Sequence, residues 1–114
     1  MDRNFYITTP IYYPSAKPHM GHAYSSIVSD FFARFKRIDD FNVSFLTGTD
    51  EHGLKIQRAA QKKGMDTLKF CDEISQTFRD LSKTLNLSNT DFIRTTEDRH
   101  KLSVQHLWNE LKKN

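Results

Sequence analysis

Residues 5–22 read FYITTPIYYPSAKPHMGH, and this stretch decides the fold because it joins two patterns of secondary structure. Its first residues are aromatic or β-branched, which is typical of a short strand, and prolines at positions 10, 14 and 18 then forbid regular structure. From Gly21 onward, apolar residues recur at the spacing of one helix face: Tyr24, Ile27, Val28, Phe31, Phe35 and Ile38. We therefore expect a strand, a loop and an amphipathic helix with His19 and His22 at its entrance.

The entrance of this helix is a candidate binding site for an anion. A helix N-terminus presents unpaired backbone N–H groups and the positive end of its dipole, and Gly21 gives a ligand room to approach the backbone. The imidazoles of His19 and His22 can both point at the same anion. The alternative is that the two histidines are ordinary polar residues that cap a helix, and the motif alone does not decide between them.

A second strand is predicted over residues 43–47, and it ends at Gly48. The order strand, helix, strand is that of a βαβ unit, in which the strands are parallel and ligands gather at their carboxyl ends. Residues 10–22 and 48–53 follow those ends. The sequence therefore predicts an α/β fold with its site between these two segments.

The rest of the chain predicts four more elements: a helix over 54–63 that ends at Gly64, a longer helix capped by Asp66-Thr67, a strand over 91–94 and a last helix opened by residues 96–98. The longer helix has an apolar seam for packing, formed by Cys71, Ile74, Phe78, Leu81 and Leu85. The last helix has an apolar face formed by Val104, Leu107, Trp108 and Leu111, and we expect Trp108 to pack.

Composition limits the class of protein. The 114 residues are 37% hydrophobic and 27% charged, which predicts at most one globular domain. The net charge of +3 is weak evidence for a nucleic-acid partner, because basic and acidic residues are interspersed. The single cysteine, Cys71, lies in the apolar seam, so we expect a buried structural thiol and no protein-bound metal. The sequence contains neither an apolar signal core nor a membrane span, so we expect a cytoplasmic protein without membrane contact.

A second group of polar residues follows the second strand. Residues 47–53 read TGTDEHG and bring two carboxylates and an imidazole to the same cleft as the histidines. Metal binding is weakly indicated, because Glu51 and His52 are adjacent and no third ligand is evident. A lone carboxylate beside an anion site is better suited to the ammonium group of an amino acid. A loop that only joins strand to helix is the alternative.

These segments in this order resemble the start of the bacterial methionyl-tRNA synthetases, which are class I aminoacyl-tRNA synthetases. The resemblance lies in residues 5–13, 19–22, 45–53 and 91–97, and it therefore covers nearly the whole chain. The element His-x-Gly-His corresponds to the HIGH signature of class I. The resemblance implies the N-terminal half of a Rossmann-type nucleotide-binding domain with parallel strands, which activates methionine with ATP and transfers it to tRNA.

The resemblance also implies roles for single residues in ATP binding. His19 and His22 would contact the ATP phosphates and act as catalytic residues by stabilising charge in the transition state. Gly21 would leave room for the adenosine. ATP is the implied substrate, and Mg²⁺ would accompany it.

Three other residues are implied to bind methionine. Asp50 would hold the α-ammonium group, the backbone carbonyl of Ile11 would bind the same group, and Tyr13 would line the side-chain pocket. Tyr12 and residues 51–53 are neighbours to which the resemblance gives no role.

Members of this family continue far beyond 114 residues. We therefore expect residues 1–114 to be the N-terminal portion of the catalytic domain, without the connective insertion, the KMSKS region and the anticodon-binding domain. Such a portion has an incomplete site, so we expect it to be inactive alone, and tRNA binding by it is doubtful. Two alternatives stay open: a small nucleotidylyltransferase, which uses a similar His-x-Gly-His turn, and a non-catalytic truncated paralogue that serves as a binding piece.

Overall fold

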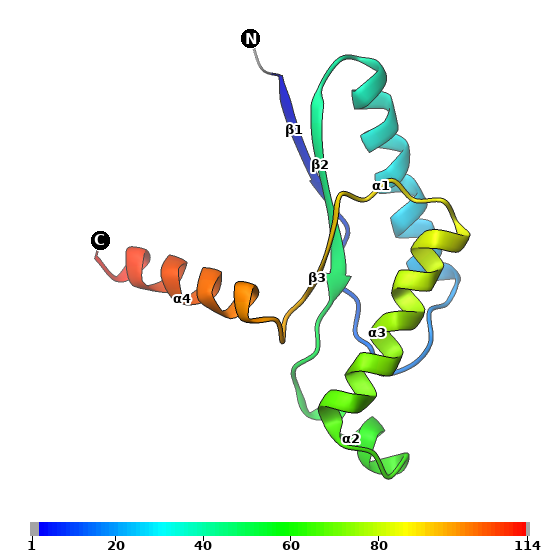
Figure 1. Cartoon of the computed structure of the whole chain (residues 1–114), viewed down its shortest axis with the longest axis vertical. Coiled ribbons are helices and arrows are strands. Elements are labelled where there is room, and N and C mark those ends of the chain that lie inside the picture. The colour runs from blue at the N-terminus through cyan, green and yellow to red at the C-terminus, as the bar shows by residue number, and fades with distance from the viewer. Residues whose placement is uncertain (1–2, 114) are drawn as a thin grey trace.

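The computed structural model describes residues 3–113 and contains one sheet of three parallel strands (Figure 1). The strands are β1 (Asn4–Thr8), β2 (Asn42–Thr49) and β3 (Asp91–Arg94), in the order β1-β2-β3. The helices are α1 (Met20–Ile38), α2 (Leu54–Lys62), α3 (Thr67–Thr84) and α4 (Asp98–Lys112). The predicted α/β class and parallel strands are therefore confirmed, with every expected helix and strand present in the expected order.

The central strand β2 is longer than predicted. It runs to Thr49 and does not end at Gly48, because Gly48 pairs with Ile93 and Thr49 pairs with Arg94 of β3. At Gly48 the two strands lie so close that a Cβ atom would stand 1.9 Å from the carbonyl oxygen of Ile93. Glycine is needed here because this close approach leaves no space for a side chain.

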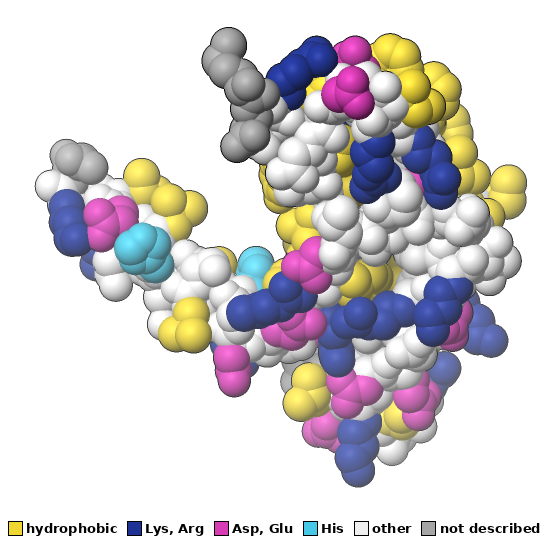
Figure 2. Space-filling view, turned by 45° about the horizontal axis from the view of Figure 1, so that its top comes forward, with side chains coloured by type: hydrophobic (Ala, Val, Ile, Leu, Met, Phe, Trp, Pro, Cys, Tyr) yellow, Lys and Arg dark blue, Asp and Glu magenta, His cyan; other side chains and the backbone are white. Residues whose placement is uncertain are grey.

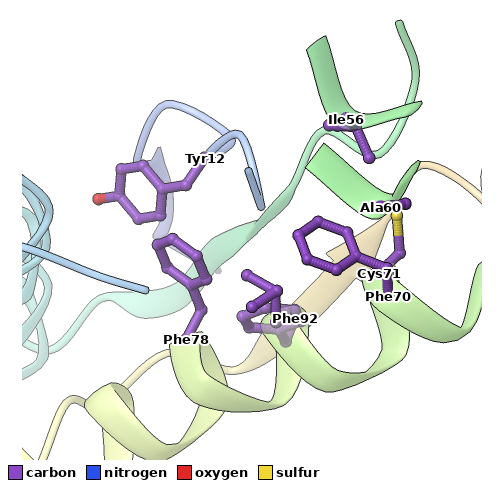
Figure 3. Packing of buried hydrophobic residues seen from close by; sticks show 8 residues of the cluster. Tyr12, Ile56, Ala60, Phe70, Cys71, Phe78 and Phe92 are labelled. Carbon is purple, nitrogen blue, oxygen red and sulfur yellow. The ribbon is translucent and has the colours of Figure 1, made fainter. Parts of the chain in front are cut away.

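Two clusters of buried side chains cover one face of the sheet. Ala33 of α1 packs on Val43 and Phe45 of β2. The second cluster joins α2 and α3 to β3 and to the loop after β1, and consists of Tyr12, Ile56, Ala60, Phe70, Cys71, Ile74, Phe78 and Phe92 (Figure 3). Three residues of the predicted seam of α3, Cys71, Ile74 and Phe78, therefore pack as expected, whereas Leu81 and Leu85 are only partly buried and lie outside this cluster. Burial raises the pKa of the Cys71 thiol to about 11, in agreement with a structural role.

The outward face of α1 carries the apolar residues that the sequence pattern identified. Their exposed fractions run from 39% at Val28 to 83% at Ile38, and hydrophobic side chains gather along α1 at the upper right of Figure 2. The buried face is formed instead by Ser26, Asp30 and Ala33. The carboxylate of Asp30 is satisfied there, since it accepts hydrogen bonds from the amide and hydroxyl of Ser88 and pairs with Arg34.

Helix α4 projects away from the sheet and has no buried residue (Figure 1). The expectation that Trp108 packs is wrong for the described residues, because its side chain is 63% exposed. Its ring has only the ammonium group of Lys112 as a charged neighbour, at 5.9 Å from the ring centroid. No helix among residues 3–113 is both long and apolar enough to cross a membrane.

Candidate active site

The site lies at the carboxyl ends of the strands, where the loop after β1 runs beside the loop after β2. Tyr12 makes this connection with its backbone: its N–H donates to the carbonyl of Gly48 at 2.9 Å, and its carbonyl accepts from the N–H of Asp50 at 2.9 Å. A parallel bridge between Tyr12 and Thr49 continues the sheet by one pair. The two segments that the sequence placed at one cleft are therefore held together by backbone hydrogen bonds.

His19 is the N-cap of α1, and the two histidines form a capping box. Nδ1 of His19 accepts a hydrogen bond from the N–H of Gly21 at 3.0 Å, and Nδ1 of His22 accepts one from the N–H of His19 at 3.0 Å. A neutral imidazole that accepts at Nδ1 carries its proton on Nε2. Both rings are therefore held as Nε2–H donors, so the capping and anion-binding interpretations are compatible.

This cap changes which atoms are free to bind an anion. The sequence led us to expect unpaired amides at the helix entrance, but the N–H of Gly21 is already bonded to His19. The amides of His22 and Ala23 donate to the carbonyl of His19 at 3.1 and 3.2 Å. The donors that remain for an anion at this entrance are therefore the Nε2–H groups of the two imidazoles and the amide of Met20, which has no acceptor among the described residues.

Two aromatic rings enclose the imidazole of His22. Tyr12 and Phe78 each meet it edge to face, with ring centroids 4.8 and 5.0 Å away, and their own rings stack (Figure 3). The hydroxyl of Tyr12 donates to the carbonyl of His22 at 3.3 Å and lies 3.0 Å from Oγ of Ser26. Burial lowers the pKa of His22, and the neighbouring His19 lowers it further, so the neutral form is favoured.

A cleft of about 420 Å³ opens beside these rings. Its lining brings together four of the predicted site residues, namely Ile11, Tyr13, His19 and His22, and adds the ammonium groups of Lys17 and Lys55. Neither lysine forms an ion pair with another described residue. Gly21 and Asp50 are not part of this lining, and Asp50 is joined to it through Tyr12.

The adjacent carboxylates of Asp50 and Glu51 differ in burial and in bonding partners. The side chain of Glu51 is fully buried, and both its oxygens bind Nε of Arg94, at 2.7 and 3.1 Å. The carboxylate of Asp50 is half-buried and accepts only a long hydrogen bond of 3.5 Å from the N–H of His52. Within the described part of the chain, Asp50 therefore has no cationic partner and remains open to a ligand cation.

Metal ligation has no support in the arrangement of the described residues. Among residues 3–113, no group of three histidine, cysteine, aspartate or glutamate side chains is placed to hold an ion. His52 points elsewhere, because its Nε2 lies 3.2 Å from the carbonyl oxygen of Thr95.

The family model described as tRNA synthetases class I (M) matches residues 5–114. The chain belongs to this family. The mitochondrial methionine--tRNA ligase of Takifugu rubripes is 56% identical over 110 residues, which are 96% of this chain and 19% of that protein. The methionine--tRNA ligase of Listeria monocytogenes is 55% identical over 107 residues, which are 94% of this chain and 16% of that protein.

A solved structure agrees with this assignment to the class I tRNA synthetases. The Mycobacterium tuberculosis methionyl-tRNA synthetase in complex with methionyl-adenylate superimposes with a TM-score of 0.94 at 45% identity, covering 97% of this chain and 22% of that one. The predicted Rossmann-type fold of class I is thereby confirmed. This chain spans about a fifth of the length of the relatives it matches. The match to class I (M) also argues against the small nucleotidylyltransferase.

Sequence reasoning gave no role to four residues of this class I tRNA synthetase that the structure places at the site. Lys17 and Lys55 line the cleft, Tyr12 connects the two loops, and Arg94 holds Glu51. The sequence could have indicated Lys17, because this residue stands two positions before His19 at the predicted anion site. No local pattern pointed to Arg94, because its partner is 43 residues away in the sequence.

Proposed function

We propose that this chain is the first part of the catalytic domain of a methionine--tRNA ligase, and that it carries binding groups for ATP and methionine. The observation that carries the proposal is the pair of imidazoles held as Nε2–H donors beside a cleft lined by two lysines that form no ion pair with another described residue. The identity of about 55% to methionine--tRNA ligases over nearly the whole chain supports it. Residues 1–114 then belong to one domain, and the connective insertion, the KMSKS region and the anticodon-binding domain lie outside them.

In the proposed first step, the carboxylate oxygen of methionine attacks the α-phosphorus of ATP. A bond forms between that oxygen and phosphorus, the bond to the bridging oxygen breaks, and pyrophosphate leaves. His19 and His22 donate from Nε2 to phosphate oxygens and stabilise the negative charge that grows in the transition state. In this proposal both imidazoles act as hydrogen-bond donors from Nε2 and do not transfer a proton.

The ammonium groups of Lys17 and Lys55 add positive charge to the same cleft. Mg²⁺ would enter with the nucleotide and would neutralise part of the phosphate charge, since the described residues offer no cluster of ligands for it. Gly21 keeps the helix entrance open for the adenosine.

Methionine is proposed to bind between the two loops that Tyr12 joins. Asp50 binds the α-ammonium group, since its carboxylate has no cation of its own among the described residues. The carbonyl of Ile11 accepts no hydrogen bond from another described residue and is a second acceptor for that group. Tyr13 is 53% exposed and is proposed to line the pocket for the thioether side chain. The second step, transfer to tRNA in the cytoplasm, is proposed for the parent enzyme.

The experiment compares the 114-residue chain with a chimera in which it replaces the matching segment of the Listeria monocytogenes enzyme. We expect the chimera to catalyse methionine-dependent exchange of pyrophosphate into ATP, and the chain alone to catalyse little or none, because half a site does not preorganise its charges. A folded chimera without exchange would refute the proposal and favour the non-catalytic paralogue. Exchange by the chain alone at the rate of the full-length enzyme would refute the expected dependence on the missing segments.

Two substitutions in the chimera separate the proposed roles. His22→Ala is expected to lower kcat for adenylate formation, because it removes a donor that acts on the transition state. Asp50→Ala is expected mainly to raise KM for methionine, because it removes the partner of the ammonium group. Unchanged kinetics in either variant would remove that residue's assignment.

A further inference from the structure

Glu51 is a buried carboxylate that the proposed reaction does not use. Its side chain has no exposed surface, and it stands one residue after Asp50. Nε of Arg94 binds its two oxygens at 2.7 and 3.1 Å, and the hydroxyl of Thr96 donates to Oε2. Arg94 is itself held by Asp72 of α3, at 2.6 Å from Nη2. Burying an ionised carboxylate is unfavourable without such partners, and these contacts offset that cost.

The loop after β3 also holds the backbone amide of Glu51 and the side chain of His52. The N–H of Glu51 donates to the hydroxyl of Thr95 at 2.8 Å. Nε2 of His52 lies 3.2 Å from the carbonyl oxygen of Thr95. Residues 51 and 52 are therefore joined to residues 94–96 by the backbone and both side chains, which leaves the segment after Asp50 little freedom to rotate.

Asp50 has no comparable contacts of its own. Its N–H bonds to the carbonyl of Tyr12 at 2.9 Å, but its carboxylate accepts only the 3.5 Å bond from His52. The direction of this carboxylate is therefore set by the backbone before and after it. We propose that Glu51 and Arg94 are positioning residues that fix the carboxylate of Asp50 for capture of the ligand's ammonium group.

This inference rests on the proposed role of Asp50 and deepens it. Loss of a purely structural ion pair would lower stability and, through the folded fraction, the apparent kcat, but it would leave KM for each substrate unchanged, whereas loss of a positioning pair raises KM for one substrate. Loss of the pair therefore raises KM for methionine and leaves KM for ATP unchanged, because both histidines and Lys17 lie on the segment between β1 and the start of α1, which Arg94 does not hold.

The kinetic test uses the active chimera with Glu51→Gln and Arg94→Lys. We expect each variant to raise KM for methionine about ten-fold, with kcat within about three-fold of the parent chimera. The double variant should be no worse than the worse single variant, since both substitutions break the same contact. Thr96→Val, which removes one hydroxyl donor at nearly constant shape, is the milder variant if the others do not fold.

Asp30→Asn is the matched control. Asp30 is also a buried carboxylate paired with an arginine, at 2.7 Å from Arg34, but it joins α1 to Ser88 away from the site. We expect this variant to lower stability and to leave KM for methionine within about two-fold. An unchanged KM in the Glu51, Arg94 and Thr96 variants, or an equal rise in the Asp30 variant, would overturn the positioning role.

A second measurement on the 114-residue chain does not depend on activity. Hydrogen exchange of the Asp50 amide reports the order of this loop, and the Phe45 amide, which donates to the hydroxyl of Thr90, serves as an internal reference in the preceding strand β2. Glu51→Gln should raise the ratio of the two rates about ten-fold, and Asp30→Asn should leave the ratio unchanged. An unchanged ratio in Glu51→Gln would overturn the inference even in an active chimera. If the ratio rises in the Glu51→Gln chain while the chimera is inactive, the positioning of Asp50 is supported and only the proposed reaction is refuted.

Discussion

The imidazole rings of His19 and His22 stack with their centroids 3.9 Å apart, while each ring accepts a backbone hydrogen bond at Nδ1. Two imidazolium ions at this distance would repel each other, and protonation at Nδ1 would break the capping hydrogen bond. The pair is therefore most stable when both rings are neutral. The same pair that caps the helix is thus ready to donate two hydrogen bonds from Nε2.

This relationship predicts how stability depends on pH. Burial, and then the neighbouring His19, lowers the pKa of His22 from its ordinary value of 6.5. The unfolded chain consequently binds more protons than the folded chain just below pH 6.5. The stability that the neutral ring contributes is present above pH 6.5 and is lost as the pH falls through the lowered pKa of the folded state.

Urea unfolding of the 114-residue chain at several pH values measures this effect. We expect the free energy of unfolding to fall as the pH drops from 7.5 to 5.5, because this is about the range in which a histidine gains its proton. The fall should be smaller in His22→Gln, which lacks the titrating group. His106→Gln on the exposed α4 is the control and should keep the full dependence. The same slope in the parent and His22→Gln would contradict the prediction.

Gly21→Ala is expected to displace the imidazole of His19. A Cβ atom at Gly21 would stand 2.9 Å from Cε1 and 3.1 Å from Nδ1 of His19, so the ring must move and its capping bond is lost. The lost cap costs about 1 kcal/mol, and alanine in the helix recovers about 1 kcal/mol. Stability should therefore change little, while kcat of the chimera falls about ten-fold.

Pyrophosphate exchange and urea unfolding together test this prediction. Ser29→Ala in the same helix is the control and should leave kcat unchanged. A Gly21→Ala chimera with normal kcat would show that the position of the His19 ring does not matter for catalysis.

Gly48→Ala tests the close approach of β2 and β3. Its Cβ would stand 1.9 Å from the carbonyl oxygen of Ile93, a contact that only separation of the two strands relieves. We expect a loss of about 3 kcal/mol in the free energy of unfolding, measured by urea denaturation of the chain. Ser44→Ala on the open face of β2 is the control and should change stability by less than about 0.5 kcal/mol. Equal stability of the two variants would contradict the proposed strand spacing.

The order of the elements was predictable from the sequence, but the buried face of α1 was not. Periodicity located the helix, yet its apolar residues point outward and Asp30 lies on the buried face. That face is stable because Ser88 and Arg34 satisfy the carboxylate, and both contacts depend on tertiary structure. Hydrophobic spacing measures the composition of a helix face and carries no information on which elements cover it.

The candidate site was predictable to a similar extent. The helix entrance and the two loops follow from strand and helix order, so the places of His19, His22 and Asp50 in the fold were predictable, while their roles stay predictions. The difference between Asp50 and its neighbour Glu51 was not predictable, because it depends on Arg94 in β3. The sequence also did not predict which nitrogen of each imidazole is free to bind a ligand, because this depends on the geometry of the capping box.

Tyr12 supplies a last prediction, because its side chain touches His22 while its backbone holds Asp50. Tyr12→Phe keeps the ring and the backbone bonds but removes the hydroxyl, which bonds to the carbonyl of His22 and to Ser26. We expect a loss of about 1 kcal/mol in stability of the chain and about a three-fold lower kcat in the chimera. Tyr12→Leu also removes the ring against His22, so its kcat should fall by at least about ten-fold.

A double-mutant cycle with Ser26→Ala separates this hydroxyl contact from general damage. The hydroxyl of Tyr12 lies 3.0 Å from Oγ of Ser26, so both single substitutions remove one shared bond. The double variant Tyr12→Phe/Ser26→Ala should therefore have the kcat of the worse single variant. Tyr6→Phe alters a tyrosine that is 64% exposed on β1, and we expect no change in kcat or stability. Effects that multiply in the double variant would mean that Tyr12 and Ser26 act independently, and the contact between the two hydroxyls would then have no part in placing His22.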